Sequence, residues 1–218
     1  MAQPASAESR IDRPEGEPFH WVLLGLFFAV LIWSVIYPHD LFTWFLEVLP
    51  ALIVLPTLVC TYRRFPLTHL VYILILLHAC ILMVGGHFTY AREPVFAWLA
   101  QVFHWPRNNY DKLGHFAQGF VPAMVAREIL LRKTPLKRGG WLFVLVVAVC
   151  GALSALYEIF EMAMSMASGG KADDFLGEQG YVWDTQTDML MAFIGAVVAQ
   201  LTLSGLHDRQ LRESHLTD

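Results

Sequence analysis

Six stretches of about twenty mostly apolar residues dominate the sequence, and an α-helix needs a run of that length to cross a lipid bilayer. They cover roughly residues 20–37, 41–61, 68–90, 110–131, 140–164 and 186–206. The composition agrees, because 56% of the residues are hydrophobic and only 16% are charged, against roughly 25% charged in a typical soluble domain. A soluble chain of this size could not bury so much apolar surface. We therefore expect an all-α, polytopic membrane protein, with a bundle of about six transmembrane helices over residues 19–207.

The two ends of the chain are polar. Residues 1–18 are rich in Ala and Pro and mixed in charge, which predicts a disordered N-terminal tail. Residues 208–218 are expected to form a short C-terminal tail. The net charge is −4, and no basic patch interleaved with aromatic side chains is present, so nucleic acid is not an expected partner. The expected partner is the lipid bilayer.

Lys and Arg are divided unevenly between the two sides of the predicted bundle. Eleven lie in the segments of one side, which include both tails, and four in the segments of the other. Because cytoplasmic segments carry the excess of positive charge, both termini are expected in the cytoplasm. The loops around 38–40, 91–109 and 165–185 then lie outside. The second of these loops carries Trp98 and Trp105, which predicts a short helix at the membrane interface.

Ionisable side chains gather at one depth of this arrangement. Such groups are costly inside a membrane, so their positions carry information about function. With alternating helix directions and a rise of 1.5 Å per residue, seven of them fall within about 10 Å of the same, extracytoplasmic boundary. They are His87, Asp111, His115, Glu158, Glu161, Asp184 and Asp188.

The spacing of these residues places them in pairs on common helix faces. Asp111 and His115 are four residues apart, as are Asp184 and Asp188, and Glu158 and Glu161 are three apart. Imidazole and carboxylate groups are ligands for divalent cations. They serve equally well as a general acid/base pair.

Each pair also has a purely structural interpretation. Asp111 and Asp184 open their helices, where a carboxylate caps free N–H groups. A lone His115 would more often be a satisfied polar group between helices. Glu158 and Glu161 are harder to explain in this way, because they lie near a helix C-terminus, where the dipole disfavours anions. A positive group is expected beside them, and the candidates are a metal ion, His115, Lys112, His87 and Arg92.

Four motifs resemble the YjdF family of bacterial inner-membrane proteins. They are YDKLGHF at 110–116, ARE at 126–128, YEIFE at 157–161 and WDTQTDM at 183–189. The resemblance spans nearly the whole chain and implies a multi-pass protein of the bacterial inner membrane, with no assigned activity. A more distant similarity is to VanZ-like membrane proteins, which are associated with envelope and glycopeptide-resistance phenotypes. It implies a shared polar site, although Glu161 stands where that pattern has Gln.

Three functions remain open at this point. In the first, Glu161 or His115 acts as a general base beside a divalent metal, and the substrate is a lipid or a lipid-linked envelope precursor. The metal ligands would come from Asp111, His115, Glu158, Asp184 and Asp188, and His87, Lys112 and Arg92 would complete the polar site. In the second, the protein is a small proton-coupled transporter in which the two glutamates carry protons. In the third, it is a structural or regulatory membrane subunit without catalysis.

Overall fold

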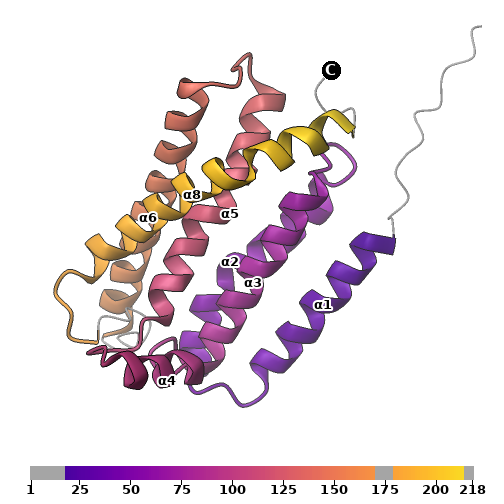
Figure 1. The fold of residues 1–218 in the computed structure, drawn as a ribbon. Helices are drawn as coiled ribbons and strands as arrows, with labels where there is room; N and C mark the ends of the chain where they lie inside the picture. Colours follow the sequence, from indigo (N-terminus) through magenta and orange to yellow (C-terminus); the bar gives the residue numbers. More distant parts are fainter. Residues whose placement is uncertain (1–17, 170–178, 214–218) are drawn as a thin grey trace, which may run out of the picture.

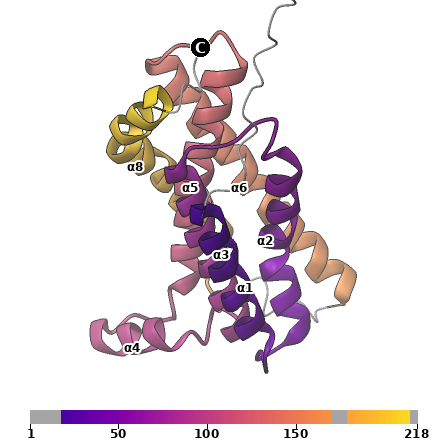
Figure 2. The ribbon, with the colours of Figure 1, turned by 90° about the vertical axis from the view of Figure 1, so that its right-hand side faces the viewer.

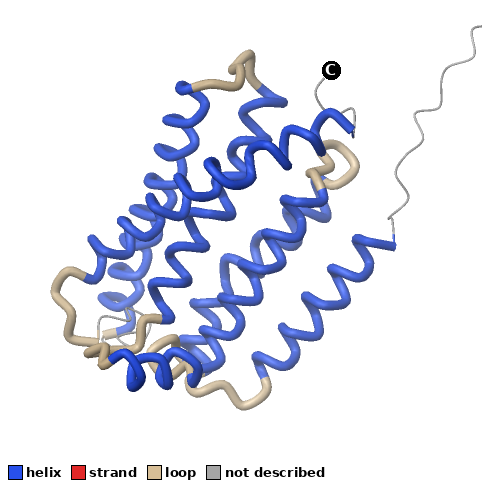
Figure 3. The backbone as a smooth tube through the Cα atoms, in the orientation of Figure 1, coloured by secondary structure: helices blue, strands red, loops and turns tan. Residues whose placement is uncertain are grey.

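The computed structural model describes residues 18–169 and 179–213, and every regular element within them is a helix (Figure 3). The helices are α1 (Pro18–Val35), α2 (Leu41–Thr61), α3 (His69–Phe88), α4 (Pro94–Phe103), α5 (Tyr110–Lys133), α6 (Gly140–Ser168) and α8 (Asp184–Glu213). The predicted all-α class is confirmed. Apart from Pro18, the predicted N-terminal tail lies outside the described residues, as does the acidic part of the 165–185 loop.

Five of the helices, α1, α2, α3, α6 and α8, are long and apolar enough to cross a membrane. This confirms a polytopic membrane protein. The α5 helix has 24 residues and is also long enough, but its charged side chains lower its mean hydropathy. It packs against α3, α6 and α8, so protein surrounds many of its polar groups. That α5 provides a sixth crossing stays a prediction.

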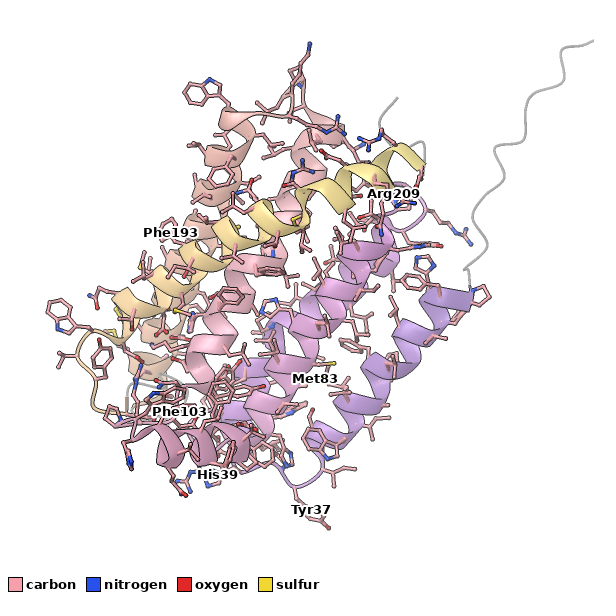
Figure 4. The ribbon with its side chains drawn as sticks, in the orientation of Figure 1. Tyr37, His39, Met83, Phe103, Phe193 and Arg209 are labelled. Carbon is pink, nitrogen blue, oxygen red and sulfur yellow. The ribbon has the colours of Figure 1, made fainter. Side chains whose placement is uncertain are left out.

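The α5 helix lies at the centre of the bundle. The α8 helix runs across α5 and α6, while α1 and α2 both pack against α3 on the other side (Figure 1). One apolar core joins α3, α5, α6 and α8 around Val71, Met124 and Val146. A second core joins α1, α2 and α3 around Met83 (Figure 4). Two apolar layers therefore meet along α3.

Small residues let α5 and α8 approach until their backbones touch. A Cβ atom on Gly119 would overlap the carbonyl group of Ala192, and one on Gly195 would overlap the α5 backbone. Small residues at such interfaces are typical of membrane helices. Both helices begin at the same end of the bundle and run in the same direction (Figure 1). His115 and Asp188, each one turn before the Gly119–Ala192 contact, are therefore brought face to face.

The end of the bundle that holds the α1–α2 turn, α4 and the first residues of α5 and α8 is called the α4 end below. Tyr37, His39 and Phe103 lie at this end, and Arg209 lies at the opposite end (Figure 4). At the α1–α2 turn the backbone N–H of Thr43 donates to Asp40 Oδ1 at 2.6 Å. This bond starts α2 and holds the pKa of Asp40 below its usual range.

A short helix is present in the 91–109 segment, as the sequence predicted. This helix, α4, projects from the side of the bundle and buries none of its residues (Figure 2). Glu93 caps it by accepting a hydrogen bond from the N–H of Phe96 at 2.7 Å. Trp98 and Phe103 are each 59% exposed. Exposed aromatic side chains suit the headgroup level, but the position of α4 at the membrane interface stays a prediction.

The last helix is longer than predicted. It continues to Glu213, past the predicted end at 206. His207 is fully buried, and Asp208 pairs with Arg127 at 2.8 Å. These contacts pack the final turns against α5, so the first part of the predicted tail at 208–218 is helical. Its last five residues lie outside the described ones.

Candidate functional site

Six of the seven acidic and imidazole side chains predicted to share one depth lie together at the α4 end. Each is between 2% and 8% exposed. They come from three different helices, so the tertiary structure, not local sequence, assembles them. They are Asp111 and His115 of α5, Glu158 and Glu161 of α6, and Asp184 and Asp188 of α8.

His115 is the centre of this group. Its Nε2 lies 3.3 Å from Asp111 Oδ1 and 3.9 Å from Asp188 Oδ1. Its Nδ1 lies 2.9 Å from Gln118 Oε1 and 3.6 Å from Glu158 Oε1. Acceptors therefore face both ring nitrogens. A neutral imidazole has a single N–H, so this environment favours a protonated ring or a ring that binds a cation through one nitrogen.

Two further cations face the α8 carboxylates. Lys112 Nζ lies 2.7 Å from Asp184 Oδ1, hydrogen-bonds Asp188 Oδ1, and lies 3.4 Å from Asp111 Oδ2. Arg107 Nη2 lies 2.6 Å from Asp184 Oδ1. Asp184 is thus paired with two cations. Of the positive groups that were expected beside Glu158, His115 is one that lies near it.

A cavity of about 70 Å³ adjoins the cluster. This is room for ordered water, since roughly 10–15 Å³ of such space is enough to hold one molecule. Asp111 and His115 form one wall, and Glu161 of α6, His78 of α3 and Glu47 of α2 contribute to the others. The cluster therefore opens into a small space between helices, which apolar side chains such as Leu82 also line, and is not packed solid.

Glu47 is a site residue that the sequence interpretation missed. It is only 5% exposed and is the one charged residue in the stretch 41–61. A lone carboxylate in an apolar span is itself a signal of function, and this signal would have found it. Its depth would not have shown that it faces the cavity, because that depends on how α2 packs against α3.

Carboxyl groups outnumber bases around His115. A carboxylate buried without a partner is costly, so the excess acids must be protonated or must share a cation. The bases are Lys112, Arg107, His115 itself and, across the cavity, His78. The carboxyl groups are Glu47, Asp111, Glu158, Glu161, Asp184 and Asp188.

Two predicted members of the polar site lie elsewhere. The Nδ1 atom of His87 lies 3.1 Å from the carbonyl oxygen of Ser34, and its ring packs against Trp33 with 4.6 Å between ring centroids. Arg92 is exposed in the turn before α4. His87 shares the depth of the cluster, but it points toward α1.

Three side chains could together hold a metal ion. One ligand atom from each of Asp111, His115 and Asp188 lies within 4.8 Å of the other two. A mixed imidazole and carboxylate set suits Zn²⁺ or Mn²⁺. Because Lys112 hydrogen-bonds Asp188, a cation would use the second oxygen of that carboxylate or displace the ammonium group.

A second buried ionic network lies at the opposite end of the bundle. Glu128 is fully buried and accepts from Thr68 Oγ1 at 2.8 Å and from Arg132 Nη1 at 2.7 Å. Arg127 Nη1 lies 2.8 Å from His207 Nδ1. A guanidinium group only donates, so Nδ1 accepts, and the Nε2–H of His207 donates to Glu128 at 2.9 Å. This network ties α5 to α8 and to the start of α3, and the side chains named here find their hydrogen-bond partners among the described residues.

Comparison with known proteins gives the family. The family model described as "Predicted membrane protein (DUF2238)" matches residues 19–209. The chain is 50% identical over 183 residues to the inner membrane protein YjdF of Escherichia coli (strain K12), which covers 84% of this chain and 88% of that protein. No solved structure matches the chain. The predicted resemblance and the inner-membrane location are confirmed: the chain belongs to the DUF2238 family of predicted membrane proteins.

Proposed function

We propose that Asp111, His115 and Asp188 bind a divalent cation, and that the protein uses it to hydrolyse a phosphate- or carboxyl-ester bond of an envelope lipid. The observation that carries this proposal is the meeting of three buried ligand groups within 4.8 Å of one another. The excess of carboxyl groups around His115 supports it, because a divalent cation would compensate the charge that Lys112 and Arg107 leave unbalanced.

The remaining polar residues receive distinct roles. A cation beside His115 would polarise a phosphoryl or carbonyl oxygen of the substrate. Glu161 lines the cavity and is the proposed general base. It takes a proton from a water molecule as the water oxygen bonds to phosphorus or carbon, and the leaving oxygen receives the proton when its bond breaks. Asp184, held by Lys112 and Arg107, is a positioning residue.

The proposed substrate follows from the position of the site. The loops and helix ends at the opposite end of the bundle carry the basic residues that mark the cytoplasmic side. The α4 end is then extracytoplasmic, where the exposed aromatic side chains of α4 would lie among lipid headgroups. An ester or phosphate group of a lipid would reach the cluster at that depth.

A proton-coupled transporter receives less support. Transport of protons needs polar groups across the whole membrane. Between His115 and Arg127 the α5 helix carries a single polar side chain, Gln118. At a rise of 1.5 Å per residue this segment is about 18 Å long. The two polar clusters are therefore separated along α5 by a mostly apolar layer.

Metal analysis tests the first half of the proposal. The full chain is purified in detergent, stripped with a chelator and reloaded with Mn²⁺ or Zn²⁺, and bound metal is measured by mass spectrometry. We expect stoichiometric metal in the unaltered protein and its loss in His115→Ala and Asp188→Asn. Glu213→Gln, which changes an exposed acid, should retain the metal. Absence of metal, or full retention in Asp188→Asn, would refute the cation site.

Isotope incorporation tests the second half. The reloaded protein is reconstituted with bacterial lipid extract in H₂¹⁸O, and released phosphates and carboxylic acids are analysed. We expect one ¹⁸O atom per product. Glu161→Gln should lower the rate by a factor on the order of 10² to 10⁴, typical of a lost general base, while retaining bound metal. If the metal-loaded protein yields no ¹⁸O-labelled product, the cation site stands and the proposed hydrolysis is refuted.

A further inference from the structure

A second concave region lies far from the carboxylate cluster, between α1, α2 and α3. It is a groove of about 230 Å³, and nearly all of its wall is apolar. The α1 wall extends from His20 to Phe27, and the α2 wall from Leu55 to Tyr62. This surface belongs to no part of the proposed reaction.

The two ends of the groove differ. On the side toward the α4 end, Phe27 is only 6% exposed, and Trp44 Nε1 donates to Ser34 Oγ at 3.1 Å, so α1 closes onto α2 and α3 there. At the other end, Tyr62 Oη lies 3.4 Å from His20 Nδ1, and Tyr72 packs edge-on against the same imidazole. The groove therefore has a closed apolar floor and a mouth lined by aromatic side chains with polar tips.

The groove is shorter than one leaflet of the bilayer. From His20 to Phe27 the α1 wall is about 10 Å long at 1.5 Å per residue. Half of a hydrocarbon core of about 30 Å is about 15 Å. A partner helix that crosses the membrane, or a second copy of this chain, would need a face running the full thickness of the bilayer. A single acyl chain stays within one leaflet, and the groove covers about two thirds of that depth.

The mouth carries positive charge. Arg63 and Arg64 follow Tyr62 directly, and both are exposed. Among the described residues neither forms an ion pair with an acidic side chain. Tyr and His side chains with polar tips suit the headgroup level. Basic residues at such a level attract anionic lipids.

We propose that this groove, lined by α1, α2 and α3, binds one anionic phospholipid. An acyl chain fills the apolar wall between His20 and Phe27, and the phosphate lies against Arg63 and Arg64. The lipid would fill the space between α1 and α2, which α1 leaves open because it packs mainly against α3. This proposal is independent of the cation site at the other end of the bundle.

Native mass spectrometry of the delipidated, detergent-purified full chain tests the proposal, with phosphatidylglycerol and phosphatidylcholine as probes. We expect one retained phosphatidylglycerol per chain, bound at least tenfold more tightly than phosphatidylcholine. Leu55→Trp or Leu24→Trp, which fill the groove from opposite walls, should abolish retention of both lipids. Leu201→Trp, on an outward face of α8, should not. Helix content and elution volume show that the variants fold.

Removal of the mouth charges gives a separate outcome. The double variant Arg63→Gln, Arg64→Gln should bind phosphatidylglycerol as weakly as phosphatidylcholine. The matched double variant Lys133→Gln, Lys137→Gln should retain the tenfold preference. The proposal is wrong if both groove-filling variants keep the lipid, or if the unaltered protein binds the two lipids equally. It is also wrong if Leu55→Trp dissociates an oligomer without changing bound lipid.

Discussion

Two buried glutamates show how partners decide what a carboxylate does. Glu128 accepts hydrogen bonds from Thr68, Arg132 and His207 and is fully buried. Glu47 is also buried, but it faces a cavity that it shares with His115. The first carboxylate is satisfied by its neighbours, so we interpret it as structural. The second has space beside it, which favours a role with a ligand.

Replacement of Glu128 should destabilise the fold. Glu128→Ala leaves His207 without its acceptor and Arg132 with only the Pro66 carbonyl oxygen, and breaking a buried pair in this way costs about 3–5 kcal/mol. Thermal unfolding in detergent should show a large fall in midpoint. Glu213→Ala, which removes an exposed pair with Arg209, should change stability by less than about 1 kcal/mol. Equal effects of the two variants would contradict the structural interpretation of Glu128.

Replacement of Glu47 should not destabilise the fold in this way. In metal-free protein, Glu47→Gln removes a buried negative charge from a region rich in carboxyl groups, so it should leave stability unchanged or raise it. With saturating Mn²⁺ the unaltered protein should gain stability by ligand binding, and the variant should gain less. Melting curves without and with Mn²⁺ measure the stability of the metal-free protein and the gain from metal binding. A variant that is strongly destabilised in metal-free protein would show that the Glu47 carboxyl group, which lies beside Tyr90, is structural.

At the level of elements, the contact between α5 and α8 sets the geometry of the cluster. Gly119 and Ala192 let the two backbones touch; one turn away His115 meets Asp188, and about two turns away Lys112 meets Asp184. Since both helices run in the same direction, this register is repeated along the interface. The separation of two helix backbones thus controls the separation of the charged groups.

Gly119→Ala should therefore weaken metal binding, although Gly119 is not a proposed ligand. The added methyl group has no room beside the Ala192 carbonyl, so α8 must shift, at a cost of about 1–3 kcal/mol for overpacking. We expect a lower melting temperature and weaker binding of Mn²⁺ than in the unaltered protein. Gly205→Ala is the control, because a Cβ atom there meets nothing within 4 Å. Unchanged metal affinity in Gly119→Ala would show that the α5–α8 distance does not position the ligands.

At the level of the whole molecule, the two polar clusters lie at opposite ends of the bundle, and the membrane orientation gives each its environment. The distribution of Lys and Arg predicts that the α5–α6 loop is cytoplasmic and that the α4 end is not. The proposed substrate depends on this orientation, because only a site at the extracytoplasmic face can reach envelope lipids on that side of the membrane.

Cysteine labelling in whole cells tests the orientation. In a background without the three native cysteines, Asp173→Cys should react with an impermeant maleimide added outside. Lys137→Cys should react only after the membrane is permeabilised. The contrary pattern would place the candidate site on the cytoplasmic side and remove the argument for an extracytoplasmic lipid substrate, although the cation site itself would stand.

The sequence alone determined the helical membrane class and the common depth of the acids. Apolar runs of about twenty residues have the length of a membrane helix, which pairs the N–H and C=O groups that lipid cannot satisfy. The rise per residue then places every side chain along the membrane normal. Depth could not show which way a side chain points. His87 and His115 share a depth, but His87 turns to Ser34 while His115 meets Asp111. Glu47 reaches the cavity only through the packing of α2 on α3. The rotation of each helix about its axis depends on contacts with its neighbours, and only the tertiary structure decided it.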